Sequence, residues 1–390
     1  MPMKPIPYGH QDVNQADIDA VIEVLRSDWL TQGPTISCFE RKVAEYCGAK
    51  YAVAVSSATA GLHLACLAAG LGEHDILWTS PNTFVASANC GRYCGAQVDF
   101  VDIDPLSYNL SVTELENKLI QASVQQKLPK VVIPVHFAGQ SCNMAKIAQL
   151  AQHYQFTVIE DASHALGGSY REQKVGNCAF SDMVVLSFHP VKIITTGEGG
   201  MILTNRLDLY EKLLQLRSHG ITREPQQMRE TSHGAWYYQQ IDLGYNYRMT
   251  DIQAALGISQ LTRLDQFVAR RHQLVARYHQ ALAHLPLILP YEEAESYSAY
   301  HLYVIQLKLN EISQTRKQIF DKLRAANILV NVHYIPVHTQ PYYQQFGFKI
   351  GDFPQSEKYY RAAISLPLFP SLSEVEQDYV IQAVQQVIIT

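Results

Sequence analysis

The chain has 390 residues, of which 47% are apolar and 17% are charged, and its formal net charge is −5. The apolar fraction excludes a disordered chain, and the acidic balance gives no general reason to expect a nucleic acid or an anionic membrane surface as a partner. The length suggests about two domains. No apolar run approaches the ~20 residues of a membrane span, and residues 1–7 lack the apolar core of a signal peptide. We therefore expect a soluble, cytoplasmic protein.

Seven cysteines are scattered through the chain without a CxxC pair, and their odd number indicates reduced thiols. They are Cys38, Cys47, Cys66, Cys90, Cys94, Cys142 and Cys178. Cys90 and Cys94 are four residues apart and could meet on one helix face, but no second pair at zinc-site spacing accompanies them. We interpret the cysteines as small, buried apolar side chains and expect no metal site.

Short β-branched runs alternate with helical stretches from about residue 50 to 205. Strands that are apolar at successive positions are buried on both faces, so this alternation predicts a parallel sheet covered by helices. The predicted strands are residues 51–55, 76–79, 98–101, 131–135, 157–160, 183–187 and 201–204. Between them we predict one helix from Ser111, where Glu114 completes the spacing of a capping box, and another at 144–153.

Residues 221–247 interrupt this pattern with a polar, tyrosine-rich loop. A long loop of this kind inside a compact fold usually serves a site or an interface. Thr250 then caps a helix whose apolar period continues to about residue 284, and we expect this helix to bridge two domains. The elements predicted after it are a strand at 301–309, a helix at 313–326, an extended segment at 329–335 and a last helix from Ser373. We divide the chain into a large domain, 1–255, and a smaller C-terminal α/β domain, 256–390.

Two residues that follow predicted strands have complementary chemistry. Asp161 comes directly after the strand at 157–160, so its carboxylate should emerge at the carboxyl end of the strand, where open α/β sheets bind ligands. Lys192 lies just beyond the strand at 183–187, where a desolvated niche would lower its pKa and let the neutral amine condense with an aldehyde. Together they indicate a pyridoxal 5′-phosphate site, with Lys192 as the Schiff-base amine and Asp161 at the pyridinium nitrogen, and these are our two catalytic residues. The alternative for Asp161 is a cap of the following turn.

A phosphate site is predicted at 56–63, where a strand ends and a helix of small residues begins. The free N–H groups and the dipole of a helix N-terminus attract an anion, and the hydroxyls of Ser57 and Thr59 add donors. An ordinary helix cap is the alternative there. Ser187, at the end of its own strand, is a further candidate donor to the phosphate.

Two more residues are candidates for contacts with the cofactor ring. Phe84 could stack on the ring, although a phenylalanine of the core has the same sequence signature. His164 lies three residues after Asp161 and could touch the ring substituents, or could be a buried structural histidine. The glycines at 197–200 precede a strand and lack the full dinucleotide pattern, so we discount a nucleotide cofactor there.

Four segments in this order resemble the DegT-type sugar-nucleotide aminotransferases. They are Ser-Ser-Ala-Thr-Ala-Gly-Leu-His-Leu-Ala at 56–65, Glu-Asp-Ala-Ser-His-Ala-Leu-Gly at 160–167, Ser-Phe-His-Pro-Val-Lys with Gly-Glu-Gly-Gly at 187–200, and Gly-Tyr-Asn-Tyr-Arg-Met-Thr-Asp at 244–251. The likeness extends from Trp29 to His338. It implies the α/β fold of type I pyridoxal phosphate aminotransferases, in which helices sandwich a seven-stranded, mostly parallel sheet and a smaller α/β domain follows.

The resemblance also implies roles for single residues. Lys192 carries the coenzyme covalently and Asp161 binds the pyridinium. The phosphate is bound by Ala58, Thr59 and Ser187, and Phe84 covers the ring. Asn246 reaches the phosphate held by the other subunit, so the resemblance implies a homodimer with shared active sites.

The resemblance implies a substrate class as well. The motifs at 187–200 are most similar to family members that move the amino group of L-glutamate to C4 of a UDP-4-keto-6-deoxy-N-acetylhexosamine. One branch of the family has histidine in place of the lysine and dehydrates sugars, whereas this chain has Lys192. That dehydratase, an aminotransferase for another nucleotide-linked 4-keto sugar and a non-catalytic sensor of nucleotide sugars are the alternatives.

Four residues are candidates for substrate contacts. They are Trp29 at the sugar, and Arg248, Tyr334 and His338 at the nucleotide diphosphate, where cations or donors must compensate the acidic average of the chain. For Arg248, Tyr334 and His338, a salt bridge or hydrophobic packing is an equally good interpretation.

Overall fold

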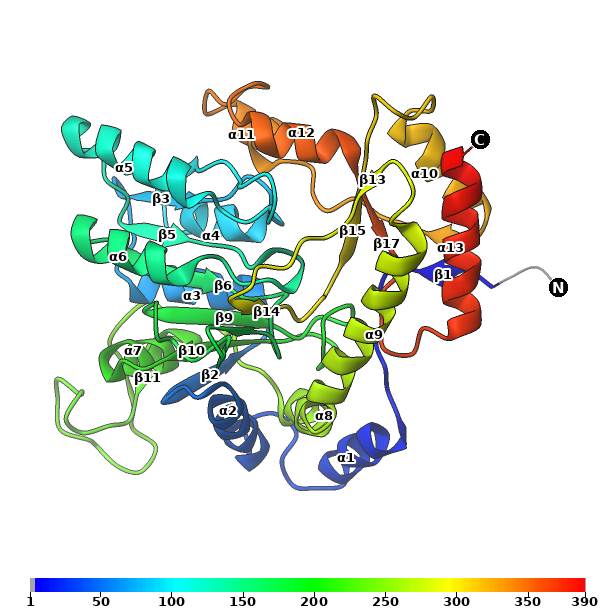
Figure 1. Ribbon diagram of the computed structural model, residues 1–390. Coiled ribbons are helices and arrows are strands. Elements are labelled where there is room, and N and C mark those ends of the chain that lie inside the picture. The colour runs from blue at the N-terminus through cyan, green and yellow to red at the C-terminus, as the bar shows by residue number, and fades with distance from the viewer. Residues whose placement is uncertain (1–3, 390) are drawn as a thin grey trace.

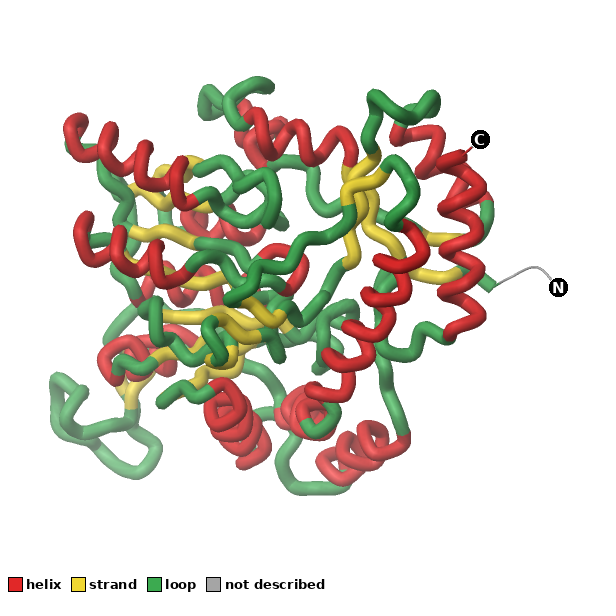
Figure 2. The backbone as a smooth tube through the Cα atoms, viewed as in Figure 1, coloured by secondary structure: helices red, strands yellow, loops and turns green. Residues whose placement is uncertain are grey.

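A seven-stranded sheet lies at the centre of the larger part of the molecule (Figures 1 and 2). The structure is a computed structural model that describes residues 4–389. In spatial order the strands are β2 (Tyr51–Val55), β10 (Gly200–Thr204), β9 (Met183–Ser187), β6 (Thr157–Asp161), β5 (Val131–Ile133), β3 (Ile76–Thr79) and β4 (Gln97–Phe100). Only β10 runs antiparallel to its neighbours in this sheet. The predicted mostly parallel sheet is therefore confirmed.

Helices cover both faces of this sheet, as the alternating apolar runs predict. One face packs against α3 (Ala58–Ala68), α4 (Ala86–Tyr93) and α7 (Leu207–Arg217). The other packs against α2 (Pro34–Cys47), α5 (Val112–Gln125) and α6 (Met144–Tyr154). Side chains alternate along each strand, so Val53 of β2 belongs to the first core and its neighbour Ala54 to the second. Burial on both faces makes the sheet a rigid support for residues at the ends of its strands.

The predicted bridging helix at 250–284 is wrong in one respect, because it is two helices. The first, α8 (Asp251–Leu261), begins with the expected capping box of Thr250 and Gln253, and the second, α9 (Leu264–Leu282), follows after a break. Thr262 Oγ1 donates to Ser259 O at 2.6 Å and closes the end of α8. Arg263 leaves helical geometry, and its guanidinium bonds the carboxylate of Asp17. An apolar period continues across such a break, so periodicity alone could not place it.

The C-terminal part of the chain has a core of its own. The strand β15 (Tyr303–Leu307) pairs with β13 (Leu287–Ile288) and β17 (Ala363–Leu366), and these strands pack with α9, α10 (Arg316–Ala325) and α13 (Glu374–Ile389). The remaining α-helices are α1 (Gln15–Leu25), near the N-terminus, and α11 (Pro341–Gln344) and α12 (Pro354–Ala362), in the C-terminal part. The predicted strand at 301–309 and helix at 313–326 correspond to β15 and α10.

Two strand pairs connect the C-terminal part to the rest of the chain. The strand β1 (Ile6–Pro7) pairs in parallel with β16 (Ile328–Leu329), and β14 (Ser296–Tyr297) pairs with β7 (Ser169–Tyr170), whose other neighbour is β8 (Gln173–Lys174). The division near residue 255 remains our proposal, and these pairs cross it.

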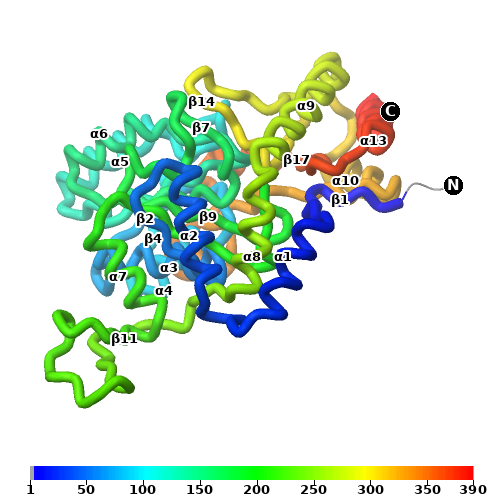
Figure 3. Tube along the Cα trace, turned by 90° about the horizontal axis from the view of Figure 1, so that it is seen from below, coloured from blue at the N-terminus to red at the C-terminus, as the bar shows by residue number. Residues whose placement is uncertain are grey.

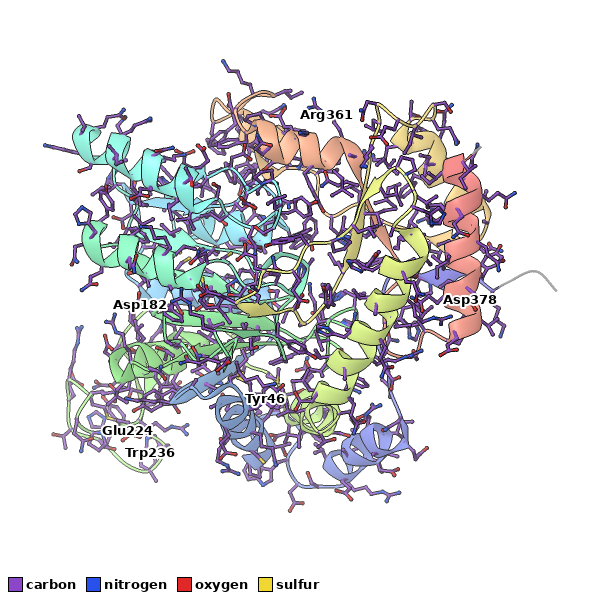
Figure 4. All side chains as sticks on the ribbon, in the orientation of Figure 1. Tyr46, Asp182, Glu224, Trp236, Arg361 and Asp378 are labelled. Carbon is purple, nitrogen blue, oxygen red and sulfur yellow. The ribbon has the colours of Figure 1, made fainter. Side chains whose placement is uncertain are left out.

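The polar loop expected at 221–247 projects from the body of the molecule as an arm (Figures 3 and 4). Its base is the strand pair β11 (Ile221–Thr222) and β12 (Gln239–Gln240). Glu224 and Trp236 lie on the projecting part, and Trp236 is 74% exposed. We refer to residues 221–240 as the arm.

From the sequence we expect neither a membrane-spanning helix nor a metal site. Within residues 4–389 no helix is both long and apolar enough to span a membrane, and no three His, Cys, Asp or Glu side chains are grouped to hold a metal ion. The first three residues of the segment in which we expect no signal peptide lie outside the described residues.

Candidate active site

A cleft of about 630 Å³ lies at the carboxyl ends of β2, β6 and β9 and is closed by residues 331–334 of the C-terminal part. Nine of the predicted site residues line it: Ser57, Ala58, Thr59, Phe84, Asp161, His164, Ser187, Lys192 and Tyr334. They come from segments far apart in the sequence. The parallel sheet brings them together because the carboxyl ends of its parallel strands share one edge.

Asp161 is the last residue of β6, and both of its carboxylate oxygens are held by serines. Oδ1 accepts hydrogen bonds from Ser163 N at 3.1 Å and Ser163 Oγ at 2.6 Å, and Oδ2 accepts one from Ser87 Oγ at 2.7 Å. Because side chains alternate along a strand, the preceding Glu160 points to the other face, where it bonds His136 at 2.6 Å. Asp161 is 6% exposed, so its carboxylate is fixed in the cleft and not in solvent.

Lys192 lies in the loop that joins β9 to β10. The next two residues, Ile193 and Ile194, are buried in the core and anchor this loop under the cleft. Burial lowers the pKa of the Lys192 amine to about 8, although the negative charge of Asp161 acts to raise it. About a tenth of such an amine is neutral at pH 7, far more than of a free lysine. Burial thus lowers the pKa of this amine in the direction that a Schiff-base lysine requires.

The N-terminus of α3 forms an anion cradle. Ser57 caps this helix, as the alternative interpretation has it, with its Oγ accepting from Ala60 N at 3.1 Å. In the part of the chain that the structure describes, no hydrogen bond occupies the N–H groups of Ala58 and Thr59. Two free donors at a helix N-terminus suit a phosphate group. The cap and the anion site are thus compatible.

Gly200 makes room for this cradle. It is the first residue of β10, and a Cβ atom there would lie 2.7 Å from Ala58 N and 2.7 Å from Ser57 C. Real side chains do not tolerate such contacts with backbone. The glycine therefore lets β10 approach the end of α3 closely.

Tyr334 and neighbouring imidazoles close the cleft from the C-terminal part. His164 Nδ1 accepts from Ala138 N at 3.3 Å, so the neutral ring carries its proton on Nε2 and donates it to Tyr334 Oη, 3.1 Å away. This assignment leaves the phenolic proton of Tyr334 free to donate into the cleft. Burial lowers the pKa of His164 well below its usual value, and burial followed by the charge of Lys192 lowers that of His333 to about 3. The wall is therefore polar and uncharged at neutral pH.

The ring of Phe84 lies at the mouth of the cleft. It is 58% exposed, and its centroid is 6.4 Å from that of Tyr334. It is not a phenylalanine of the core, which was the alternative interpretation. Its position leaves the ring free to cover a flat ligand.

His338 is not brought to the cleft, and we correct our assignment of it to the substrate. It is fully buried and bonds Glu357 through Nε2 at 3.0 Å. A buried imidazole paired with a carboxylate in this way has a structural role. The sequence neighbour Val337 is also fully buried, so this whole segment faces the core.

Trp29, Asn246 and Arg248 do not line the cleft. Trp29 is 58% exposed. Asn246 Oδ1 accepts from Arg248 Nε at 3.1 Å and Nη2 at 2.9 Å. The backbone of Arg248 bridges to Val55, the residue that ends β2 just before the anion cradle. Asn246 and Arg248 therefore lie beside the edge strand β2, close to the point where this strand leads into the anion cradle.

The cleft has further lining residues to which we assigned no role from the sequence. They are Tyr8, Ser56, Leu62, Thr83, Ala86, Val135, Ser163, His189, Val191, Glu198, Asn331, Val332 and His333. Ser163 could have been found, because it follows Asp161 by two residues in an Asx-turn position. Ser87 is 74 residues from the carboxylate that it bonds, and only the fold reveals that contact.

Comparison with known proteins bears on this geometry. Residues 11–385 match the model of the DegT/DnrJ/EryC1/StrS aminotransferase family. The chain belongs to this family. Pyridoxal 5′-phosphate is the coenzyme of these sugar aminotransferases, and Lys192, Asp161 and the cradle fit its aldehyde, its ring nitrogen and its phosphate. The protein is therefore a pyridoxal phosphate-dependent sugar aminotransferase.

Three relatives resemble nearly the whole chain. The spore coat polysaccharide biosynthesis protein SpsC of Bacillus subtilis is 41% identical, over 98% of this chain and 97% of its own. The UDP-4-amino-4,6-dideoxy-N-acetyl-beta-L-altrosamine transaminase of Campylobacter jejuni is 36% identical, over 96% and 95%. The GDP-perosamine synthase of Caulobacter vibrioides is 36% identical, over 95% of each chain.

Two solved structures have the same fold over nearly their full length. Helicobacter pylori PseC, an aminotransferase involved in the biosynthesis of pseudoaminic acid, superposes with a TM-score of 0.90 at 29% identity and covers 99% of this chain and 100% of its own. The PLP-form of the sugar aminotransferase Spr1654 of Streptococcus pneumoniae gives 0.88 at 29% identity and covers 99% of each chain.

Replacing Gly200 by alanine is expected to weaken coenzyme binding about tenfold or more, which corresponds to about 1.4 kcal/mol. The reason is that the added Cβ must displace the backbone of Ser57 and Ala58. Titration of pyridoxal phosphate into the apoprotein, followed by absorbance, measures the dissociation constant. Gly72→Ala is the matched control, because no atom lies within 4 Å of a Cβ at that position. Equal affinities of the two variants would contradict the role of Gly200.

The lowered pKa of Lys192 predicts how the stability of the apoprotein depends on pH. Between about pH 8 and 10.5 the unfolded chain binds more protons at this lysine than the folded chain does. The free energy of unfolding should therefore rise with pH through this window, by up to about 3 kcal/mol. Chemical denaturation of the apoprotein at a series of pH values measures it. Lys192→Met should remove this rise, and a slope that is unchanged in the variant would exclude Lys192 as its source.

Proposed function

We propose that the protein moves the amino group of L-glutamate to C4 of a UDP-4-keto-6-deoxy-N-acetylhexosamine. The products would be UDP-4-amino-4,6-dideoxy-N-acetyl-β-L-altrosamine and 2-oxoglutarate, on a pathway to pseudaminic acid. The observation that carries the amino transfer is a lysine of lowered pKa in one cleft with a serine-held aspartate and a free helix N-terminus. The name of the Campylobacter jejuni relative and the Helicobacter pylori structure support the substrate.

Pyridoxal phosphate, when bound, supplies an aldehyde carbon and a ring that withdraws electrons from the carbon bearing the amine. Asp161 holds the proton on the ring nitrogen, which keeps the ring an effective electron acceptor. Ser87 and Ser163 fix the carboxylate for this contact, since each of its oxygens accepts at least one of their hydrogen bonds. The N–H groups of Ala58 and Thr59 bind the phosphate and set the position of the ring.

Lys192 moves the proton in both half-reactions. Its neutral amine removes the proton from Cα of glutamate in the first, and its ammonium form returns a proton to C4 of the sugar in the second. An amine with a pKa near 8 can do both at neutral pH, because both forms are populated. Tyr334, whose Oη accepts from His164 Nε2, would donate its phenolic proton to an oxygen of the substrate.

The three alternative functions, a dehydratase, a sensor and an aminotransferase for another sugar, require different chemistry from this cleft. A dehydratase of this family has histidine at the position of Lys192, and His189, three residues earlier, lines the cleft without replacing that lysine. A sensor without turnover would not need an amine of lowered pKa. An aminotransferase for another nucleotide-linked 4-keto sugar remains the second candidate, because the Caulobacter vibrioides relative is named for a GDP-linked sugar.

We also propose that the active protein is a homodimer in which each subunit completes the other's site. Asn246 is exposed and lies outside the cleft of its own subunit. It would reach the phosphate bound by the partner. The arm at 221–240, which ends close to this residue in sequence, extends beyond the body of the molecule (Figure 3). Such an arrangement would add donors to a cradle that otherwise offers mainly backbone N–H groups.

The amino transfer is tested with Lys192→Ala. This variant should lose turnover by more than about 10³-fold, because it lacks the only group that we assign to proton transfer at carbon. Borohydride reduction of the wild-type holoenzyme should label Lys192, and peptide mapping of the variant should find no label. Lys317→Ala, at an exposed pair with Asp321, is the control and should keep full activity. Assay of UDP- and GDP-linked 4-keto sugars by product mass then decides the substrate, and preference for a GDP-sugar would overturn our assignment.

Arg248 is expected to act on the nucleotide sugar and not on glutamate. Arg248→Gln should raise the KM for the sugar at least about tenfold while the KM for glutamate changes less than about twofold. Steady-state kinetics with each substrate varied in turn measures this difference. Arg229→Gln, on the arm, is a control for the loss of one positive charge. Equal changes in both KM values would argue that Arg248 only supports Asn246, which it bonds.

A further inference from the structure

A cluster of three cysteines and one histidine lies between α3 and α4, and the amino transfer does not use it. Cys66 and His63 are one turn apart on α3, and Cys90 lies on α4 with Cys94 at its C-terminal end. Residues at spacings of three and four share a helix face, so each helix presents its pair to the other. We call these four residues the thiol cluster.

The thiols of this cluster differ in their access to solvent. Cys66 and Cys90 are fully buried, whereas Cys94 is partly exposed. Cys66 and Cys90 belong to one core, Cys94 packs against the same core, and Cys94 is a direct neighbour of the Cys66 thiol. Cys90 Sγ donates to Ser87 O at 3.3 Å, which occupies its proton. Cys94 is thus the thiol that a small reagent meets first, with Cys66 directly behind it.

The imidazole of His63 is held beside Cys94. Its Nδ1 is 3.4 Å from the hydroxyl of Tyr247, and its ring packs edge-on against Tyr245 and Tyr93, with centroids 4.9 and 5.5 Å away. Within residues 4–389 its other nitrogen, Nε2, is buried without a hydrogen-bond partner. A buried ring nitrogen without a partner is costly in a purely structural role. It is available to exchange a proton with a neighbouring thiol.

The neighbours of Cys94 and Cys66 shift the pKa values of these two thiols in opposite directions. A hydrogen bond from Cys66, and then the proximity of His63, lower the pKa of the Cys94 thiol against the opposing effect of burial. Contacts with Cys90 and then Cys94, followed by burial, raise the pKa of the Cys66 thiol. Cys94 is therefore disposed to be the thiolate, which is the nucleophilic form of cysteine, and Cys66 to stay protonated. A metal site is not the explanation, because no group suited to a metal ion is found in the described chain.

We propose that Cys94 is a peroxide-reactive thiol that forms a reversible disulfide with Cys66. In the first step the Cys94 thiolate attacks hydrogen peroxide, the O–O bond breaks, and with one proton taken up the products are the Cys94 sulfenic acid and water. In the second step Cys66 attacks the Cys94 sulfur, an S–S bond forms, and the departing hydroxide takes the proton of Cys66 and leaves as a second water. Two thiols lose two electrons, and one peroxide becomes two waters. A dithiol reductant reverses the change.

The disulfide would join the two helices that carry the coenzyme contacts. The N-terminus of α3 provides the anion cradle, and α4 carries Ser87, which bonds Asp161. This modification site is independent of the sugar that the enzyme uses. Five of the seven cysteines are buried, as we expect from the sequence, whereas Cys38 and Cys94 are partly exposed, and the proposal gives Cys94 a chemical role.

The test uses the reduced, desalted holoenzyme and a few equivalents of hydrogen peroxide at pH 7. Peptide mapping without reductant should show a peptide in which Cys66 is linked to Cys94, and dithiothreitol should remove it. Cys94→Ser should give no linked peptide. Cys66→Ala should stop the reaction at the sulfenic acid of Cys94, which dimedone traps. Coenzyme absorbance and near-ultraviolet circular dichroism establish that each variant is folded.

Alkylation rates provide the second measurement. At about pH 6.5 iodoacetamide should label Cys94 at least about fivefold faster than Cys38, because a thiol of lowered pKa is more thiolate there. Cys38 is the matched control, being partly exposed and outside the cluster. His63→Gln should bring the rate at Cys94 closer to that at Cys38. Labelling of Cys94 no faster than Cys38, or peroxide oxidation of Cys94 without a linked Cys66, would overturn the proposal.

Discussion

The chemistry of this protein depends on the pKa of Lys192, which burial lowers and the negative charge of Asp161 raises. Burial disfavours the ammonium, the carboxylate favours it, and burial is the larger effect, so the pKa of the amine falls to about 8. A larger fraction of this amine is therefore neutral at pH 7 than of a free lysine. The hydroxyls of Ser87 and Ser163 satisfy the carboxylate from its other sides, and this keeps it available for the ring nitrogen of the coenzyme.

The sheet makes this arrangement rigid. Asp161 ends β6 and Ser187 ends the adjacent β9, and both strands are buried along their length. The loop that follows β9 could place Lys192 loosely, but Ile193 and Ile194 fasten it to the core. Antiparallel β10 then begins at Gly200, whose missing side chain lets the strand approach the N-terminus of α3. The amine, the acid and the anion cradle thus share one framework, and their spacing follows from strand order.

Much of this could be predicted from the sequence, because the signals are local. Apolar runs gave the strands 51–55, 76–79 and 183–187 at their observed bounds, and the end of a buried strand is where Asp161 had to emerge. The predictions that failed concern contacts between residues far apart in the sequence, or a helix break across which the apolar period continues. The break at Arg263 was missed because the apolar period continues across it. His338 was assigned wrongly because a histidine looks the same in the sequence whether its side chain faces a ligand or Glu357. The bond from Ser87 to Asp161 has no local signal at all.

The charge of the cleft indicates how an acidic protein can bind a substrate with a diphosphate. The imidazoles of His164 and His333 are neutral because burial and Lys192 disfavour a further positive charge, so they cannot compensate the phosphates of a nucleotide. The cradle of α3 compensates one anion, and the phosphate of the coenzyme takes it. The charge of the nucleotide must then be met outside this wall. Arg248 is the cation that we propose for this charge: its backbone bridges to Val55 just before the cradle, and its bond to Asn246 fixes it at the surface, where a second subunit would bring it to the neighbouring cleft.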